Sequence, residues 1–264
     1  MSDPRVVLIT GGGRGIGAAT AKRMAADGDK VVITARTESQ LEETAAVIRR
    51  AGGEVLVLSG DAADEERVAQ VVEETVSHFG RLDVLVNNAA LSETGDVVTC
   101  SPERFQEVLK INLTGYFCFA HYSTPHMIRS GGGVIINVSS LMAELSAGVS
   151  AAYEASKGGI DSLTFDLAVR LGPENIRVVG VRLGAIDTGI TANWAGGDEN
   201  QRRLEDYFVD LCPLGRQGTP EEAAAVLRFL ASPDASYIHG TMITVDGGRS
   251  AAFYPKSLTQ RIPR

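Results

Sequence analysis

The chain alternates short apolar runs with amphipathic segments along nearly its whole length. Apolar runs without internal alternation are typical of strands that are covered on both faces. Strand–helix alternation then predicts an α/β fold with a single doubly wound parallel sheet and helices on both faces. The expected strands are Arg5–Thr10, Lys30–Ala35, Glu54–Ser59, Leu82–Val86, Val134–Val138, Ile176–Val181 and Met242–Val245. The expected helices are Gly15–Gly28, Glu38–Ala51, Asp64–Phe79, Pro102–Lys110, Leu113–Arg129, Ser150–Leu171 and Pro220–Ala231.

The strand–helix alternation also bears on the domain organisation. A length of 264 residues suffices for one large α/β domain, and no linker or internal repeat divides the chain, so we predict a single domain over residues 1–264. The stretch Ile186–Cys212 does not follow the strand–helix alternation, and it contains Gly196-Gly197 and the only tryptophan, Trp194. It follows a strand end, where open α/β sheets bind ligands, which favours a mobile lid over about residues 186–212; a surface insertion is the alternative.

Charge and cysteine content narrow the functional classes. The formal net charge is −8, from 25 basic and 33 acidic residues, which argues against a general nucleic-acid binder because such proteins need a basic face. The three cysteines are odd in number and show no CxxC spacing, which is typical of reduced thiols in the cytoplasm. The apolar stretches are too short to span a membrane and no signal peptide is evident, so we expect a cytoplasmic protein that acts on a small molecule.

A glycine-rich turn joins the first expected strand to the first expected helix. Gly11, Gly15 and Gly17 let the backbone turn tightly and approach a phosphate group without a clash at Cβ. The helix that follows points N–H groups and a partial positive charge at the same place. Any strand-to-helix turn can use glycine, and the spacing here is G-x-x-x-G-x-G rather than G-x-G-x-x-G. The strand–turn–helix context favours a dinucleotide site.

The end of the second strand bears on the choice of cofactor. An acidic residue near this point accepts hydrogen bonds from the ribose hydroxyls in NAD-specific proteins, whereas this chain has Ala35 followed by Arg36. Arg36, together with Arg14 in the glycine turn, is suited to bind a 2′-phosphate. We therefore predict NADP(H) in preference to NAD(H). The alternative is that both arginines are solvated surface charges.

Tyr153 and Lys157 are spaced to share one face of a helix. The pKa of a free tyrosine is roughly 10, too high for a good base near neutral pH. A nearby ammonium group and a positively charged nicotinamide ring are expected to lower that pKa. Taken alone, the Y-x-x-x-K pattern is common, and a buried tyrosine beside an exposed lysine explains it equally well.

The ordered set of motifs is far more specific than any one of them, and with it the chain resembles the classical short-chain dehydrogenase/reductase family. The motifs are the Thr10–Gly17 turn, Asp61, Asn87–Ala90, Asn112, Ser140, the Tyr153/Lys157 pair and Val245–Gly248. The resemblance covers nearly the whole chain. It implies a Rossmann fold, a nicotinamide cofactor and usually a homotetramer, with a homodimer as the alternative.

The resemblance also implies residue roles. Tyr153 donates a proton to the carbonyl oxygen during reduction, and Ser140, thirteen positions before it, holds that oxygen. Lys157 holds the nicotinamide ribose, and Asn112 positions a water that links Lys157 to solvent. The implied cofactor-binding residues are Gly11, Arg14, Gly15, Ile16, Gly17, Arg36, Asp61, Ala62, Asn88, Ala89, Tyr153, Lys157, Gly184, Ile186 and Thr188.

The chain departs from the family pattern at two places. Val179 and Leu183 stand where the family usually has asparagine and proline, which is expected to loosen the loop that faces the nicotinamide. The tail over residues 249–264 is longer than a minimal family ending. Its aromatic residues and Arg261 either reach a neighbouring subunit's site or form a frayed terminus. His121 and His126 share a helix without a third ligand, so no metal site is expected.

Substrate contacts are expected from the segments after Asn88 and Ser140 and from the lid. The candidates are Glu93, Ser140, Met142, Glu144 and Trp194, and these segments also offer Leu91, Leu141, Leu145, Tyr207 and Phe208. The acids among them favour a polar, amine-bearing substrate; the alternative is that they face solvent.

We therefore predict an NADPH-dependent oxidoreductase that reduces a ketone to a secondary alcohol with Tyr153 as proton donor. The first alternative is an NAD(P)-dependent alcohol, sugar or polyol dehydrogenase that works in oxidation. The second is a non-catalytic nucleotide-binding protein.

Overall fold

The computed structural model describes residues 4–189 and 198–259. Its centre is a seven-stranded sheet in the order β3-β2-β1-β4-β5-β6-β7, in which every neighbouring pair runs parallel. This confirms the predicted doubly wound parallel sheet. The strands are β1 (Val6–Thr10), β2 (Lys30–Thr34), β3 (Val55–Val57), β4 (Val84–Asn87), β5 (Gly133–Ser140), β6 (Ile176–Leu183) and β7 (Met242–Val245).

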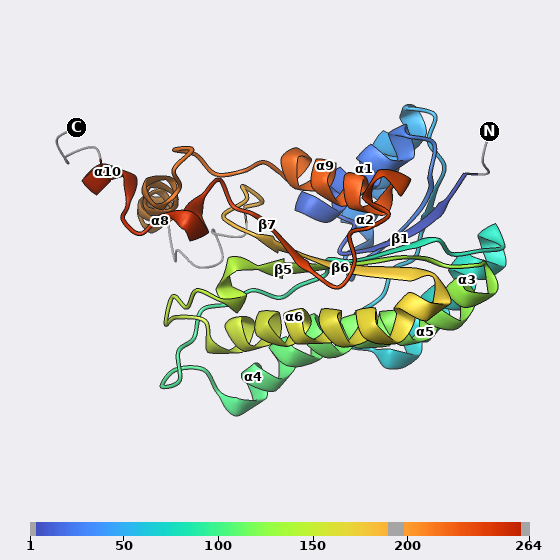
Figure 1. Cartoon of the computed structure of the whole chain (residues 1–264), viewed down its shortest axis with the longest axis horizontal. Coiled ribbons are helices and arrows are strands. Elements are labelled where there is room, and N and C mark those ends of the chain that lie inside the picture. The colour runs from blue at the N-terminus through green and yellow to red at the C-terminus, as the bar shows by residue number, and fades with distance from the viewer. Residues whose placement is uncertain (1–3, 190–197, 260–264) are drawn as a thin grey trace.

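Helices cover the sheet on both faces (Figure 1). One layer contains α1 (Gly15–Ala26), α2 (Glu38–Arg50) and α9 (Pro220–Ala231). The opposite layer contains α3 (Glu65–Phe79), α4 (Pro102–Leu109), α5 (Gly115–Arg129) and α6 (Ala151–Leu171). Two further helices, α8 (Asp198–Leu211) and α10 (Lys256–Thr259), lie together at one end of the molecule, outside both layers. None of the described helices is long and apolar enough to cross a membrane.

The sheet divides the hydrophobic core into two clusters. Successive side chains of a strand point to opposite faces, so Val7 and Ile9 of β1 pack under α1 and α2, whereas Val6 and Leu8 pack in the cluster below α3 and α5. All four are buried. The unbroken apolar character of the strands thus reflects burial on both faces.

Local signals define several helix ends close to where the sequence predicts them. The Asp64 side chain accepts a hydrogen bond from the Arg67 amide at the start of α3, and Gly80, with φ of 81°, ends that helix. At the start of α9, Thr219 and Glu222 each accept a hydrogen bond from the other's backbone amide, which is a capping box.

The structure differs from the sequence-based expectation at two helices. The two helices expected around 102–110 and 113–129 are joined without a break by a π-helical turn, Lys110–Thr114. Helix α8 lies within the stretch that was expected to be an irregular lid. Residues 190–197 of that stretch, with Trp194, lie outside the described residues.

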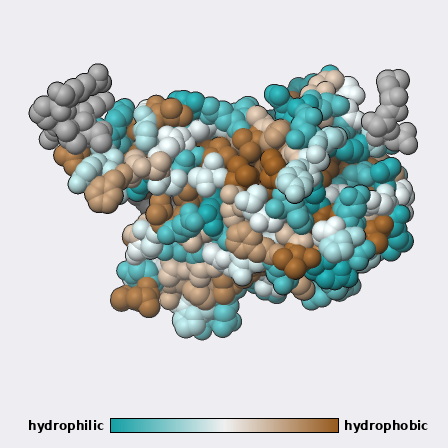
Figure 2. Space-filling view, viewed as in Figure 1, coloured by the Kyte–Doolittle hydropathy of each residue, from teal (hydrophilic) through white to brown (hydrophobic). Residues whose placement is uncertain are grey.

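The described part of the tail packs against α8 of the same chain. The Ser257 amide and hydroxyl donate to the two carboxylate oxygens of Asp210 at 2.8 and 2.7 Å, and these hydrogen bonds lower the pKa of Asp210. Phe253 and Tyr254 stack edge to face and are exposed, and Arg261 lies outside the described residues. The outline of the molecule is indented between this end and the lower helical layer (Figure 2).

Candidate active site

A cavity of about 1050 Å³ runs along the carboxyl ends of the central strands. This is the edge at which doubly wound sheets bind ligands. One end of the cavity is formed by the glycine turn and the ends of β1 and β2, the middle by the ends of β4, β5 and β6, and the other end by α8 and the segments after β5 and β6. All the sequence-predicted cofactor residues line this cavity except Gly17.

Close packing explains the glycines at the first end. Gly17 is buried beneath the cavity wall, and a Cβ placed on it would meet the Gly11 carbonyl oxygen and lie 2.7 Å from the Asn88 side-chain nitrogen. Gly11 itself has φ of 68°. Asn88 donates to the Thr10 carbonyl at 2.9 Å, which ties the end of β4 to the turn. The result is a cradle of backbone that a side chain would fill, as a phosphate-binding turn requires.

Two arginines stand at the same end. Arg14 and Arg36 line the cavity and are exposed, and among the described residues neither forms an ion pair with a carboxylate. Asp61 lines the cavity nearby and accepts a hydrogen bond from the Ala63 amide at 2.9 Å. The residues present therefore fit a dinucleotide: backbone for the pyrophosphate, and free guanidinium groups for a further anionic group.

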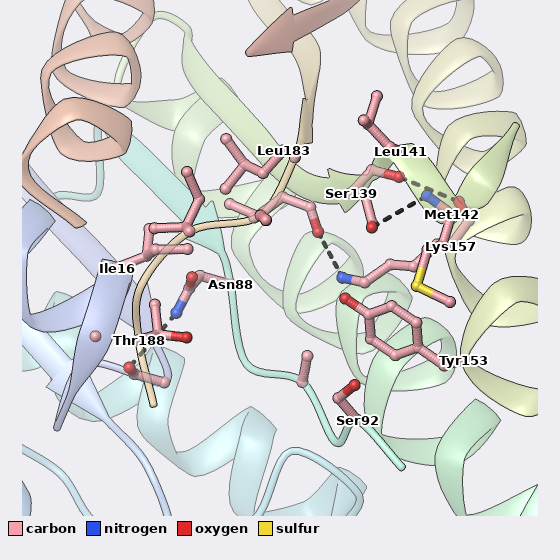
Figure 3. A pocket seen from close by; sticks show the side chains of 18 of the residues that line it. Ile16, Asn88, Ser92, Ser139, Leu141, Met142, Tyr153, Lys157, Leu183 and Thr188 are labelled. Carbon is pink, nitrogen blue, oxygen red and sulfur yellow. Dashed lines mark hydrogen bonds between the residues drawn. The ribbon is translucent and has the colours of Figure 1, made fainter. Parts of the chain in front are cut away.

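Tyr153 and Lys157 point into the middle of the cavity from α6 (Figure 3). Ser140, at the end of β5, also lines the cavity. The Lys157 Nζ donates to the Val138 carbonyl at 2.8 Å and lies 5.4 Å from the centre of the Tyr153 ring. The Ser140 Oγ accepts from the Met142 amide at 3.1 Å. Three predicted catalytic side chains thus come together although two different elements carry them.

Asn112 lies behind this group, on the π-helical turn, and does not line the cavity. Its side-chain oxygen accepts from the Leu91 amide at 2.7 Å, and its nitrogen donates to the Leu91 carbonyl and to the Ser156 Oγ, each at 3.0 Å. The amide therefore joins the segment after β4 to α6. A π-turn at such a point is common near functional sites because it redirects the side chains that follow.

Burial shifts the pKa values of both Tyr153 and Lys157. It raises the pKa of Tyr153 to about 12, and hydrogen bonding with Ser140 offsets part of the rise. It lowers the pKa of Lys157 to about 7, and the Asp161 carboxylate opposes that shift. Loss of water penalises the phenolate, so burial opposes the lowered pKa that the sequence suggested for Tyr153 beside an ammonium group and a positively charged nicotinamide ring. At neutral pH Tyr153 carries its proton.

The acids proposed as substrate contacts are engaged elsewhere. Glu93 forms an ion pair with Arg104, and Glu144 forms one with Arg182 at 2.5 Å. Neither lines the cavity, so the prediction that they face the substrate is wrong for this geometry. The cause is the presence of arginine partners that are distant in sequence. Met142 does line the cavity, as predicted.

The loop after β6 is held despite the missing proline. The Gly184 amide donates to the Val245 carbonyl at 2.9 Å, and the Asp187 amide donates to the Gly218 carbonyl at 2.9 Å. Leu183 is buried in the core cluster below α9. Thr188 lines the cavity beside Gly15. Backbone hydrogen bonds to β7 and to the segment before α9 thus hold the loop that Val179 and Leu183 were expected to loosen.

Sequence reasoning missed part of the wall at the other end. Ser92 lines the cavity and was not singled out. The inner face of α8 also lines it: Tyr207 and Phe208 were expected from the sequence as substrate contacts, whereas Leu204 and Leu211 were not. Their spacing of three, four and seven residues is the signal of an amphipathic helix and would have revealed α8.

The two histidines on α5 take part in separate interactions. His121 stacks on Phe117 with ring centres 5.9 Å apart, whereas His126 lies 2.9 Å from a Glu73 carboxylate oxygen. Within the ranges 4–189 and 198–259, no group of three or more potential ligands is arranged to hold a metal ion.

Known proteins show the same arrangement. A family model described as enoyl-(acyl carrier protein) reductase matches residues 11–250. The chain is 39% identical to the short-chain reductase protein NovJ of Streptomyces niveus, covering 94% of this chain and 95% of that protein. It is 37% identical to levodione reductase of Leifsonia aquatica over 94% and 95% of the two chains, and 32% identical to meso-2,3-butanediol dehydrogenase of Serratia marcescens over 95% and 96%.

The similarity extends to the fold. A crystal structure of levodione reductase matches with a TM-score of 0.90 at 36% identity, covering 94% of this chain and 98% of the other. Both the sequence match and the structural match to levodione reductase therefore cover 94% of this chain. The chain therefore belongs to the short-chain dehydrogenase/reductase family and is an NAD(P)-dependent oxidoreductase that acts on alcohol or ketone groups.

Proposed function

We propose that this protein is an NADPH-dependent reductase that converts a ketone into a secondary alcohol, with Tyr153 as the proton donor. The observation that carries the proposal concerns Arg14 and Arg36 at the cavity end where Ala35 stands in place of an acidic residue: neither arginine forms an ion pair within residues 4–189 and 198–259. A 2′-phosphate supplies the anionic partner that these guanidinium groups lack. NADP(H) is the cofactor carrying that group, and reduction is the direction that its reduced form supports.

The backbone around Gly11, Gly15 and Gly17 would hold the pyrophosphate, with Ile16 and Ala62 beside it. Asn88, Ala89, Gly184, Ile186 and Thr188 would line the path to the nicotinamide. When bound, the cofactor supplies the hydride.

The proton step follows from the pKa directions. Tyr153 keeps its proton at neutral pH and donates it to the carbonyl oxygen as that oxygen gains negative charge. The Ser140 hydroxyl donates a hydrogen bond to the same oxygen, and both groups are already positioned by α6 and β5. Lys157 is held by the Val138 carbonyl near the Tyr153 ring, where its charge stabilises the phenolate that remains.

The test is fluorescence titration with NADPH and NADH of wild type, Arg36→Ala and Arg50→Ala. Arg50 is an exposed arginine at the end of α2 that does not line the cavity, so its variant controls for the loss of one positive charge. We expect wild type and Arg50→Ala to prefer NADPH and Arg36→Ala to lose about tenfold in NADPH affinity without change for NADH. Equal or tighter NADH binding by wild type contradicts the proposal.

Oxidation is the alternative direction. One of the relatives is named as a butanediol dehydrogenase, which favours a diol or polyol substrate if NAD(H) is preferred. In that case the same Tyr153 accepts a proton. Initial rates with NADP⁺ or NAD⁺ and a panel of alcohols distinguish this alternative from ketone reduction.

We further propose a cytoplasmic homotetramer or homodimer built from one domain over residues 1–264, with a lid over about 186–212. Exposed Phe117, Phe165 and Val169 on α5 and α6 support a second copy against this face. The odd number of cysteines, Cys100, Cys118 and Cys212, and the lack of CxxC spacing support a reducing compartment. Light scattering during size-exclusion chromatography tests the assembly; a monomer contradicts it.

A further inference from the structure

We propose that the substrate is a ketone without a cationic group that carries an apolar, ring-sized group and a second hydrogen-bonding oxygen close to the reacting carbonyl, and that Ser92 binds this second oxygen. The inference rests on the proposed ketone reduction and specifies its substrate class. Two independent features of the cavity carry it.

The first feature is the apolar character of the substrate end. Beyond Tyr153 the cavity is enclosed by the inner face of α8 and by apolar side chains from the segments after β4 and β5. These residues are Leu91, Leu141, Met142, Leu145, Val149, Leu204, Tyr207, Phe208 and Leu211. A wall of this composition takes an apolar group of matching size from water and offers no counter-ion to a charged group.

The carboxylates that line the cavity are already engaged or lie at the cofactor end. Glu222 forms an ion pair with Arg216 at 2.6 Å. Asp246 accepts hydrogen bonds from the amides of Gly248 and Ser250 at 2.9 and 2.6 Å. A cationic substrate group would therefore enter this space without a free carboxylate and would lose hydration without compensation.

The second feature is an orphaned hydroxyl. Ser92 is 4% exposed, and its Oγ has no hydrogen-bond partner among the described residues. Three other buried side-chain atoms are also without partners, on Asn87, Ser123 and Asp161, but none of those residues lines the cavity. A buried hydroxyl without a partner is costly, so a ligand oxygen that pairs with it gains affinity.

A chain of hydrogen bonds connects the segment that carries Ser92 to Tyr153, the proposed proton donor. Its neighbour Leu91 is bonded through both backbone groups to Asn112, which donates to the Ser156 Oγ. The Ser156 Oγ in turn donates to the Tyr153 carbonyl at 2.7 Å. Ser92 is therefore fixed relative to the proton donor by a short chain of hydrogen bonds, and Figure 3 shows it near the Tyr153 ring.

The charge test uses ring ketones of similar size in NADPH-dependent reduction. The compounds are 4-methylcyclohexanone, which is neutral, and the cation 4-aminocyclohexanone. We expect kcat/KM for the neutral compound to exceed that for the cation by at least about tenfold. Equal or faster turnover of the cation overturns this substrate class.

The Ser92 test compares 2-hydroxycyclohexanone with 2-methylcyclohexanone, which has nearly the same size but lacks the second oxygen. Wild type, Ser92→Ala and the control Ser146→Ala are compared. Ser146 lines the same cavity, but its hydroxyl donates to Glu154 at 2.6 Å. We expect Ser92→Ala to lower the hydroxy-to-methyl ratio of kcat/KM about fivefold, while the control and the NADPH affinity change less than about twofold.

The outcomes separate this inference from the proposed function. An unchanged hydroxy-to-methyl ratio in Ser92→Ala overturns the role of Ser92. An equal fall in kcat/KM for both ketones, together with weaker NADPH binding, assigns Ser92 to cofactor binding and also overturns its proposed role in substrate binding. If no ketone is turned over with either NADPH or NADH, ketone reduction itself is overturned. If ketones are reduced but the cationic ketone is preferred, only the substrate class is overturned.

Discussion

The two ends of the cavity are built in different ways. At the cofactor end, backbone atoms of the glycine turn and of the strand ends form the wall, and the parallel sheet fixes their positions. At the substrate end, side chains of α8 and of the segments after β4 and β5 form the wall. A wall of backbone tolerates almost no added atoms, whereas a wall of side chains changes its shape and chemistry with each substitution. One end therefore suits a constant cofactor and the other a variable substrate.

The proposed catalytic residues lie where the two ends meet, and their substitution gives the largest expected effect. Tyr153→Phe keeps the ring but removes the proton donor, so kcat for ketone reduction should fall by about 10²- to 10⁴-fold. Because Tyr153 contributes nothing to the glycine cradle, the NADPH dissociation constant should change less than about twofold. Steady-state kinetics and fluorescence titration measure the two quantities. Full activity of the variant would exclude Tyr153 as the donor.

The second largest effect is expected from Gly17→Ala, which tests whether the backbone wall tolerates an added methyl group. Gly17→Ala places a methyl group against the Gly11 carbonyl and the Asn88 amide, so we expect cofactor affinity to fall about tenfold to hundredfold. Gly158→Ala is the control from α6, where the nearest atom to an added Cβ is the Ala143 carbonyl oxygen at 3.9 Å. That variant should bind NADPH normally. Similar affinities for the two variants would contradict the contrast between the walls.

Burial of Lys157 predicts a pH dependence of stability. The pKa of Lys157 is about 7 in the fold and 10.5 for the unperturbed group, so between these values the unfolded chain binds more protons. The free energy of unfolding should therefore rise with pH in this window, by at most about 1.4 kcal/mol per pH unit. Above pH 10 the raised pKa of Tyr153 acts in the opposite direction.

Urea unfolding at pH 7, 8 and 9 measures this effect in wild type and in Lys157→Met, which lacks the titrating group. The free energy of unfolding of wild type relative to the variant should increase over the series. A constant difference would show that Lys157 stays protonated in the folded protein and that its charge is better compensated than burial indicates.

The smallest expected effect concerns the tail that packs on α8. Asp210→Asn weakens the hydrogen bonds to Ser257, so the side-chain wall should become less well positioned and KM for a ketone should rise about twofold. NADPH affinity should not change, because the tail is remote from the glycine turn. Asp206→Asn, at an exposed position on the same helix, is the control. A matching rise in both variants would assign the effect to helix charge instead.

Much of the fold was accessible from the sequence because its signals are local. The apolar runs predict the strands, and the structure confirms a parallel sheet. The glycine spacing and the Tyr153/Lys157 spacing predict residues that do line one cavity, because a strand-to-helix turn and one helix face set their positions over a few residues. These are short-range consequences of backbone geometry.

The substrate end depended on contacts between distant parts of the chain. Glu93 and Glu144 are ordinary acids in sequence, and only the fold pairs them with Arg104 and Arg182 and turns them from the cavity. Likewise, nothing local shows that the Ser92 hydroxyl is buried without a partner. The sequence by itself determined the sheet through backbone periodicity, and its ordered set of family motifs indicated the cofactor cradle and the proposed catalytic helix. The tertiary structure decided the charge and shape of the substrate end, because burial and ion pairing depend on neighbours that only folding brings together.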